Sequence, residues 1–349
     1  MNVLVTGNMG YVGPCLVQHL RFTYDDINII GLDMGYFAHC LSNSETLPEH
    51  RVDVQYFADL RRWPSDIISL KDVDAVVHLA AISNDPMGNT FEEVTLDVNY
   101  QASISLAKRA KEAGVKSFIF ASSCSTYGFA EGGPKSEGSG LNPLTAYAKS
   151  KVFTEKDLKP LADSNFNVTI LRFGTACGMS ERLRLDLVLN DFAACAVSTG
   201  KITILSDGTP WRPLIHIHDM ARAIDWAIGR DPAKGGKFLV VNVGSDEWNY
   251  QVKDLAEAVA AVLPGVEISI NKEAQPDKRS YQVDFSLYRK LAPDYQPVIR
   301  LEEAILDLRD GLQAMNFSDS EFRDSTLIRL KVLNDLRSKG ILNDNLEWL

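Results

Sequence analysis

The 349-residue sequence has few of the features that mark specialised classes of protein. Its five cysteines are scattered and form no Cys-x-x-Cys pair, which argues against a disulfide framework or a zinc site and favours a reducing compartment. No apolar run approaches the ~20 residues of a membrane helix, and no charged leader precedes the first apolar run. The 46 acidic residues outnumber the 36 basic ones, and no basic run stands out. We therefore expect a cytoplasmic protein without a signal peptide, a membrane segment or a nucleic-acid surface.

Short apolar runs alternate with helical patterns along the chain. Buried strands are predicted over Val3–Val5, Ile27–Leu32, Val52–Asp59, Asp74–Ala81, Lys116–Ser123, Val168–Phe173 and Lys237–Val243. Helices are predicted over Cys15–Phe22, Thr90–Ala113, Thr145–Leu161, Leu185–Thr199 and Met220–Ile228, the last with Asp219 as its N-cap. Ser83–Asn89 is predicted to be a loop. This order predicts an α/β fold with a doubly wound parallel sheet, in which ligands gather at the carboxyl ends of the strands.

Three glycines at spacing three follow the first predicted strand and open the first helix. Gly7 and Gly10 let the backbone turn tightly and approach a pyrophosphate, and Gly13 lets the helix press against the strand. Asp33 ends the second strand region 20 residues after Gly13, close to the offset at which an acid reaches the ribose hydroxyls of a dinucleotide. An acid there favours NAD over NADP. The alternative for the glycines alone is an ordinary tight turn.

A hydroxyl and an amine are placed to act on a carbinol. Tyr147 and Lys151 are four residues apart on a predicted helix and therefore share one face, while Ser122 and Ser123 end a buried strand. A lysine ammonium beside a phenol stabilises the phenolate, so we expect the pKa of Tyr147 to be lowered from its usual value of about 10. Such a tyrosine can accept the proton of a carbinol, with Ser123 holding the same oxygen. The alternative is a surface helix with a chance tyrosine and lysine.

In combination, these motifs resemble the extended short-chain dehydrogenase/reductases, and among them the nucleotide-sugar epimerases and dehydratases. The resemblance covers residues 1 to about 311 and rests on the three glycines, Leu79-Ala80-Ala81, Ser122-Ser123, Tyr147 with Lys151, and Leu171-Arg172-Phe173. It implies a Rossmann domain with tightly bound NAD over residues 1–175, to which residues 214–245 return. Residues 176–213 and 246–310 would form a smaller α/β lobe for the nucleotide-diphosphate sugar, and residues 311–349 a helical extension. A homodimer through the helices near 91–112 and 145–161 is also implied.

The resemblance also implies which side chains contact each ligand. The expected cofactor residues are Gly7, Asn8, Met9, Gly10, Tyr11, Val12, Asp33, Met34, Asp59, Leu60, Leu79, Ala80, Ala81, Ser122, Tyr147, Lys151 and Phe173. The expected substrate residues are Ser83, Asn84, Thr175, Asn190, Leu205, Arg212 and Arg279. The guanidinium groups of the two arginines suit phosphate oxygens, and the alternative for each is a solvated surface arginine. His216 and His218 lack a third ligand, so we expect no metal site.

Departures from the family pattern bear on the reaction. The 4,6-dehydratases of this family have an Asp-Glu pair where this chain has Cys124 and Ser125, whereas the 4-epimerases have small or hydroxyl residues there. Thr175 replaces an expected asparagine near the sugar phosphates. The resemblance therefore favours an NAD-dependent nucleotide-sugar 4-epimerase that works through a 4-keto intermediate, with Tyr147 as the base. The alternatives are a dehydratase or 4-ketoreductase that recruits Cys124 or Ser125, and a non-catalytic NAD-sensing protein.

Overall fold

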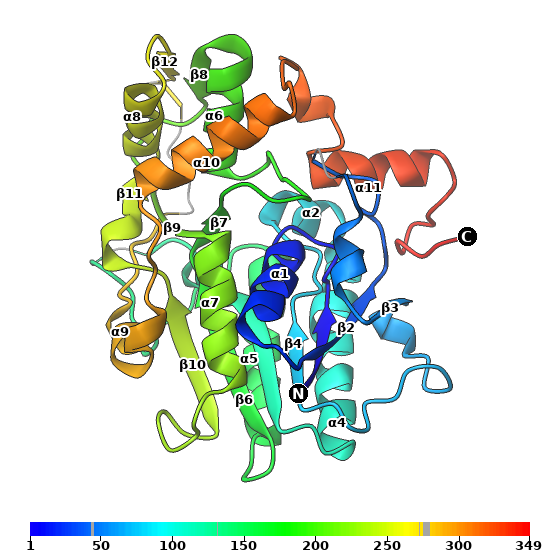
Figure 1. The fold of residues 1–349 in the computed structure, drawn as a ribbon. Helices are drawn as coiled ribbons and strands as arrows, with labels where there is room; N and C mark the ends of the chain where they lie inside the picture. The colour runs from blue at the N-terminus through cyan, green and yellow to red at the C-terminus, as the bar shows by residue number, and fades with distance from the viewer. Residues whose placement is uncertain (43–44, 131, 272, 275–279) are drawn as a thin grey trace.

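A seven-stranded parallel sheet forms the centre of the molecule (Figure 1). The computed structural model describes residues 1–42, 45–130, 132–271, 273–274 and 280–349. The strands occur in the order β10-β6-β5-β4-β1-β2-β3, and every neighbouring pair is parallel. Their bounds are β1 Asn2–Thr6, β2 Asn28–Asp33, β3 Val54–Phe57, β4 Ala75–His78, β5 Ser117–Ser123, β6 Asn167–Phe173 and β10 Phe238–Val243. The prediction of a doubly wound parallel sheet is confirmed.

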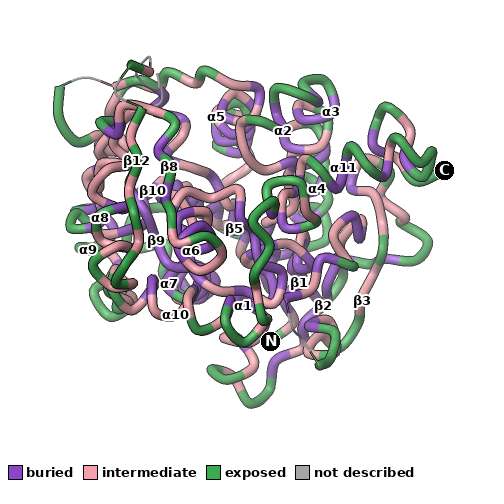
Figure 2. Tube along the Cα trace, turned by 90° about the horizontal axis from the view of Figure 1, so that it is seen from above, coloured by how far each residue is buried: buried purple, intermediate pink, exposed green. Residues whose placement is uncertain are grey.

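Helices cover both faces of this sheet because successive strand residues point to opposite sides. Val3 and Val5 pack with α1 (Gly13–Thr23) and α7 (Ile217–Ile228), which lie side by side in front of the sheet in Figure 1. Leu4, between them, packs into a second cluster with α4 (Ser103–Glu112) and the end of α5 (Ala146–Leu158). The central strands are accordingly buried in the view from above in Figure 2, whereas the last residues of the chain are mostly exposed.

A second group of elements lies beyond the carboxyl end of β6. β7 (Thr175–Cys177) begins two residues after β6 ends and joins a three-stranded sheet with β9 (Trp211–His216) and β11 (Asn249–Gln251). β8 (Lys201–Ile204) pairs in parallel with β12 (Glu267–Ile270). The helices of this group are α6 Val188–Thr199, α8 Val252–Val262, α9 Ser286–Leu291 and α10 Leu301–Ala314. β7, β12 and α9 are too short to give a pattern in the sequence, and the prediction missed them.

The helix predicted over residues 90–113 is interrupted. The structure divides it into α3 (Glu92–Leu96), a π-helical stretch (Asp97–Ala102) and α4. Asn99 of the π-helical stretch is buried, accepts a hydrogen bond from the Ile82 amide and donates one to the Ile82 carbonyl. The π-helical turn thus carries a side chain that joins the helix to the segment after β4.

Two further predictions of local structure are wrong. The expected loop at 83–89 contains α2 (Asp85–Thr90), since the Asn84 side chain accepts a hydrogen bond from the Met87 amide and caps the helix. Asp219 does not cap α7, which begins two residues earlier with His216 as its N-cap. The buried Asp219 carboxylate instead accepts the amides of Val298 and Ile299, and so joins α7 to the segment before α10.

The C-terminal segment returns to the central part of the molecule. α11 (Arg329–Ser338) contributes Val332, Leu333 and Leu336 to a buried cluster with side chains from α2, α3 and the segment after β2. In Figure 1 this segment lies beside α2, at the end of the sheet where β1 and β2 terminate. Across the described residues, no helix has the length and apolar character needed to cross a membrane.

A buried ion pair joins α5 to β6. The guanidinium of Arg172 binds the carboxylate of Glu155 with an Nη2–Oε2 distance of 2.6 Å, and both side chains are about 95% buried. Arg172 also donates to the Tyr127 hydroxyl, and Ser122 donates to Glu155. Removing one member of such a pair leaves the other as an uncompensated buried charge.

We expect Arg172→Met to lower the free energy of unfolding by about 3–5 kcal/mol, because Glu155 keeps its charge without its partner. Urea denaturation followed by circular dichroism measures this loss. The double variant Glu155→Leu/Arg172→Met should be less destabilised than the single variant, and the exposed-site variant Arg109→Met should leave the midpoint unchanged. A double variant as unstable as Arg172→Met would contradict the explanation by unpaired charge.

Candidate active site

A cavity of about 870 Å³ opens at the carboxyl ends of the central strands. It is bounded by the turn after β1, the ends of β2, β4 and β5, one side of α5, the segment after β6 and part of the C-terminal segment. Most of the predicted site residues line it, namely Gly7, Gly10, Tyr11, Val12, Asp33, Met34, Asp59, Leu60, Leu79, Ala80, Ala81, Ser83, Asn84, Ser122, Ser123, Ser125, Tyr147, Lys151, Phe173, Thr175, Leu205 and Arg212. Asn8, Met9, Cys124 and Asn190 do not line it. Arg279 falls outside the described residues.

The turn after β1 admits no side chain at two of its glycines. Gly7 has φ +76°, and a Cβ atom there would lie 2.5 Å from the backbone nitrogen of Ala80. A Cβ atom on Gly13 would lie 2.1 Å from the Asn8 carbonyl oxygen, so the first turn of α1 presses against the chain that precedes it. The first amides of α1 therefore remain close to the cavity wall, where a helix N-terminus favours anions.

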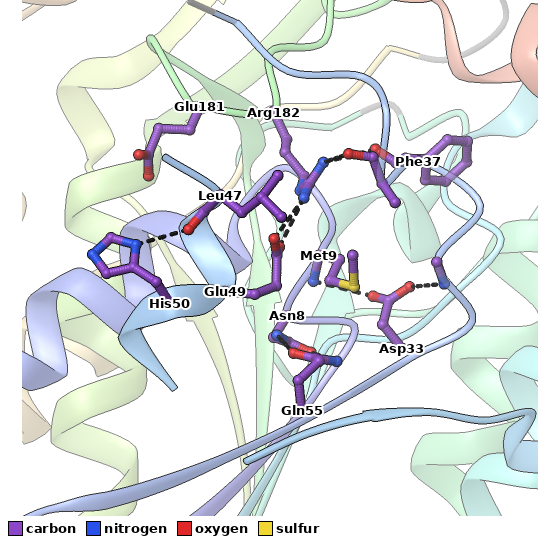
Figure 3. A network of polar contacts seen from close by, with 12 residues as sticks. Asn8, Met9, Asp33, Phe37, Leu47, Glu49, His50, Gln55, Glu181 and Arg182 are labelled. Atoms are coloured by element: carbon purple, nitrogen blue, oxygen red, sulfur yellow. Dashed lines mark hydrogen bonds and ion pairs between the residues drawn. The ribbon is translucent and has the colours of Figure 1, made fainter. Parts of the chain in front are cut away.

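Asp33 stabilises this turn from the end of β2. Its carboxylate accepts the Met9 amide at 3.1 Å and the Gly35 amide at 2.8 Å (Figure 3). Burial raises the pKa of Asp33, and the two amides act in the opposite direction. The carboxylate keeps lone pairs toward the cavity that can accept hydroxyl donors. Asn8, by contrast, points away and donates to the Gln55 side chain at 2.6 Å.

These residues fit a dinucleotide cofactor. The glycine turn exposes backbone where a pyrophosphate needs close approach, and Asp33 offers acceptors for ribose hydroxyls. Leu60 gives the far wall an apolar surface. Asp59 beside it is held by Arg61, whose Nη2 lies 2.7 Å from one carboxylate oxygen, so Asp59 fixes the wall by an ion pair of its own.

The structure brings Tyr147, Lys151 and Ser123 together. Tyr147 and Lys151 lie one turn apart on α5, which begins with Thr145 as its N-cap, and the Lys151 Nζ is 5.6 Å from the centre of the Tyr147 ring. Lys151 is buried and donates to the carbonyl oxygen of Ala121 on β5 at 2.7 Å. The Ser123 hydroxyl, at the end of the same strand, interacts with the Tyr147 phenol.

The prediction that the pKa of Tyr147 is lowered is wrong when only the groups of the protein itself act on the phenol. Burial raises the pKa of Tyr147 to about 12, and the negative charge of Asp85 adds to the increase. Hydrogen bonding to Ser123 and the charge of Arg184 act in the opposite direction. Burial also lowers the pKa of Lys151 from 10.5 to about 7. The charge of Lys151 alone would lower the pKa of Tyr147. Burial of both side chains opposes their ionisation, and this desolvation has the larger effect.

Cys124 and Ser125 differ in what they present to the cavity. The Cys124 thiol is buried, donates to the Arg172 carbonyl at 3.2 Å and has its pKa raised by burial. A thiolate at this position is therefore disfavoured. The Ser125 residue lines the cavity, and its Oγ has no hydrogen-bond partner among the residues that the structure describes.

The sequence prediction missed Arg184, which lines the cavity and whose charge acts on Tyr147. Its guanidinium donates to the Ser83 hydroxyl at 2.9 Å and pairs with Asp186, which also accepts from the Asn84 side chain. Asn84 has φ +129°, a strained backbone conformation for a residue other than glycine. Arg184 lies between the predicted strand that ends at Phe173 and the predicted helix that begins at Leu185, so no motif distinguished it.

Asn190 lies behind the wall rather than on it. Its amide donates to the Tyr11 hydroxyl at 2.9 Å and to the Arg184 carbonyl at 2.8 Å, and its oxygen accepts the Gly178 amide. The side chain thus fixes two wall residues. Leu205 and Arg212 are at the wall on the side of the second group of elements, with Leu205 largely exposed.

His216 and His218 stack on each other, with ring centres 5.2 Å apart. His216 lies 3.2 Å from a carboxylate oxygen of Asp307, and His218 lies 3.3 Å from the Cys15 sulfur. Within the described ranges, no group of three or more His, Cys, Asp or Glu side chains could hold a metal ion.

Comparison with known proteins gives consistent matches. Residues 3–244 match the family model described as NAD dependent epimerase/dehydratase. YtcB of Bacillus subtilis, an uncharacterized UDP-glucose epimerase, is 32% identical over 71% of this chain and 78% of its own. A UDP-glucose 4-epimerase of Lactobacillus helveticus is 27% identical over 79% of this chain and 87% of its own. The structure of MoeE5 with UDP-glucose and NAD is 25% identical, has a TM-score of 0.73, and covers 90% of this chain and 99% of its own. The structure of TunA, an NDP-hexosamine 5,6-dehydratase, shares the fold. It is 24% identical, has a TM-score of 0.77, and covers 91% of this chain and 99% of its own.

The burial of Lys151 predicts a pH dependence of stability. Because its pKa is lowered in the folded protein, the unfolded chain binds more protons between about pH 7 and 10.5, and stability rises with pH across this window. We expect the free energy of unfolding of the wild type, minus that of Lys151→Met, to rise by up to about 1.4 kcal/mol per pH unit there. Denaturant titrations of the nucleotide-free proteins measure this difference. The exposed-lysine variant Lys156→Met should show no such slope relative to the wild type, and a flat difference for Lys151→Met would refute the assignment.

Proposed function

Because this chain belongs to the NAD-dependent epimerase/dehydratase family, we propose that it epimerises a nucleoside-diphosphate sugar at C4 through a 4-keto intermediate. It is an NAD-dependent enzyme of the extended short-chain dehydrogenase/reductase type. Several of its relatives are UDP-glucose 4-epimerases, which supports a UDP-sugar as the substrate class. NAD supplies, when bound, the hydride acceptor for the oxidation of a carbinol carbon and a positive charge beside it.

The observation that carries the proposal is the grouping of Ser123, Tyr147 and Lys151 at one end of the cavity. Tyr147 takes the proton of the sugar hydroxyl and returns it after the sugar has turned over. Ser123 holds the same sugar oxygen by its hydroxyl. Lys151 is anchored to the Ala121 carbonyl and presents its amine to the cavity beside the Tyr147 ring.

The raised pKa of Tyr147 sets a condition on this role. With a pKa of about 12, the phenol is protonated at neutral pH when only the protein groups act on it. A neutral phenol cannot accept a proton, so additional positive charge close to Tyr147 is needed to bring its pKa down. Protonation of Lys151, whose pKa is about 7, supplies part of that charge below neutral pH.

We assign the sugar end of the substrate to the part of the cavity wall that carries Arg184, Ser83 and Asn84. Arg184 fixes Ser83 and, through Asp186, Asn84, so these polar side chains form one connected group in the cavity that Thr175 also lines. We assign the nucleotide diphosphate to Arg212 and Arg279, because a guanidinium offers paired donors to phosphate oxygens. Asn190 would act by holding Tyr11 and Arg184 rather than by contact with the sugar.

The dehydratase alternative loses one of its two candidate residues. Cys124 does not line the cavity and has a thiol with a raised pKa, whereas Ser125 lines it and has a hydroxyl without a hydrogen-bond partner among the described residues. Because neither is an effective base, an elimination of water would require another group. The cytoplasmic location and the homodimer stay predictions.

Tyr147→Phe should lower the turnover of a nucleotide-sugar by about 10²–10⁴-fold, because general acid–base transfer is lost while the ring remains. Steady-state kinetics with the accepted substrate measures the effect. Tyr100→Phe, which removes a hydroxyl from the same type of residue outside the cavity, should keep full activity. Unchanged turnover in Tyr147→Phe would refute both enzyme assignments.

The reaction type is tested by incubating the protein with a panel of nucleotide-sugars and no added cofactor. Epimerisation gives a product of unchanged mass at a new chromatographic position, since hydride leaves and returns within one turnover. We expect this result for at least one UDP-sugar, read by liquid chromatography with mass spectrometry. A product lighter by one water would show a dehydratase and overturn the proposal.

A further inference from the structure

The C-terminal segment supplies part of the cavity wall. Arg323, Ile328 and Arg329 line the cavity, although they follow the family match at residues 3–244 by about 80 residues. Arg329, the first residue of α11, is 1% exposed. Its guanidinium donates to the carbonyl oxygens of Thr326 at 3.2 Å and Arg182 at 2.8 Å, and lies 4.8 Å from the centre of the Phe37 ring.

Arg329 differs from neighbouring arginines in having no acidic partner. Arg182 pairs with Glu49, Arg184 with Asp186 and Arg323 with Asp191. In the described part of the chain, no carboxylate lies within ion-pair distance of the Arg329 guanidinium. Burial lowers the pKa of Arg329 to about 10, which still leaves it charged at neutral pH. A buried, unpaired cation is unfavourable unless an anion balances it, and this one is on the wall of a ligand cavity.

The position of Arg329 indicates which anion fits. Phe37, beneath the guanidinium, follows Asp33 by four residues on the segment that leaves β2. Arg329 is bonded to the carbonyl of Arg182, whose side chain donates to the Phe37 carbonyl in Figure 3. The cavity therefore has a cation beside the segment that carries the ribose acceptor. In a dinucleotide, the two negatively charged phosphates are attached next to the adenosine ribose, so they are the anions that this cation can meet.

The segment is fixed in this position by its last residues. The Trp348 indole donates to the Met34 carbonyl at 2.8 Å, and the Tyr36 hydroxyl donates to the Leu346 carbonyl. From the other side, Arg61 donates to the Asn345 carbonyl at 2.7 Å. The chain end thus joins the residues after β2 to those after β3, which are the two walls that flank Asp33 and Asp59.

We propose that residues 323–349 complete the cofactor site, and that Arg329 binds a phosphate oxygen of the dinucleotide. This assignment rests on NAD as the cofactor and not on the identity of the sugar. Arg329 is a binding residue in this scheme, and Tyr36, Met34 and Arg61 hold the segment that carries it. The consequence is slow loss of NAD between turnovers, as an epimerase that regenerates its cofactor in each cycle requires.

The test compares two ligands that differ in their phosphates. ADP-ribose carries the diphosphate of NAD, and adenosine carries none. For nucleotide-free protein, calorimetry should show that Arg329→Gln binds ADP-ribose about tenfold to hundredfold more weakly than the wild type, while adenosine binding is unchanged. NAD content after gel filtration of the holoprotein should fall in parallel. The glutamine can still donate to the Arg182 carbonyl, which favours a folded variant.

Arg309→Gln is the matched control, because Arg309 is on α10 outside this segment, loses the same charge and does not line the cavity. It should keep the wild-type affinity for both ligands. If Arg329→Gln does not fold, Arg329→Lys replaces it and should weaken ADP-ribose severalfold without affecting adenosine. Equal loss of both ligands, or unchanged ADP-ribose binding, would overturn the proposal. A wild type that binds no ADP-ribose would instead refute the dinucleotide site on which it rests.

Discussion

The close approach of the β1–α1 turn to the end of β4 is the constraint on which the cavity depends. At Gly7 the backbone passes so near Ala80 that a single added carbon would overlap it, and at Gly13 the first helix touches the carbonyl of Asn8. These contacts hold the helix N-terminus at the edge of the sheet, where its amides can meet an anion. Asp33 reinforces the arrangement by accepting the Met9 amide from the neighbouring strand end. The cofactor end of the cavity is therefore formed by backbone, which side-chain motion cannot collapse.

Buried charged side chains surround this frame in both paired and unpaired states. Arg172, which is buried away from the cavity, is accompanied by the carboxylate of Glu155 from a neighbouring element. Lys151 and Arg329 line the cavity, and among the described residues neither has a carboxylate within ion-pair distance. Burial lowers the pKa of both. Both cationic side chains without a carboxylate partner in this region therefore lie where a ligand can reach them, as at a binding site.

The sequence predicted the parts of the fold that have strong local signals. Buried strands of the parallel sheet are continuous apolar runs, and the glycine turn is specified by its spacing, so both were predictable. The interruption around Asn99 was not, because it depends on a hydrogen bond to Ile82, which is distant in the sequence. Arg184 and Arg329 were missed for a similar reason: each lies in a segment without a motif, and folding alone brings it to the cavity.

The pKa of Tyr147 shows why the spacing of residues predicts a site better than it predicts its chemistry. Four residues between Tyr147 and Lys151 are enough to place them on one face of a helix, and the structure has them there. The sign of the pKa change depends on desolvation and on Asp85, neither of which has a signature in that spacing. A buried phenol and a buried amine each resist ionisation, so the two groups together favour a neutral pair. Proton transfer then depends on positive charge that arrives with a ligand, which couples the chemistry of Tyr147 to occupancy of the cofactor end of the cavity.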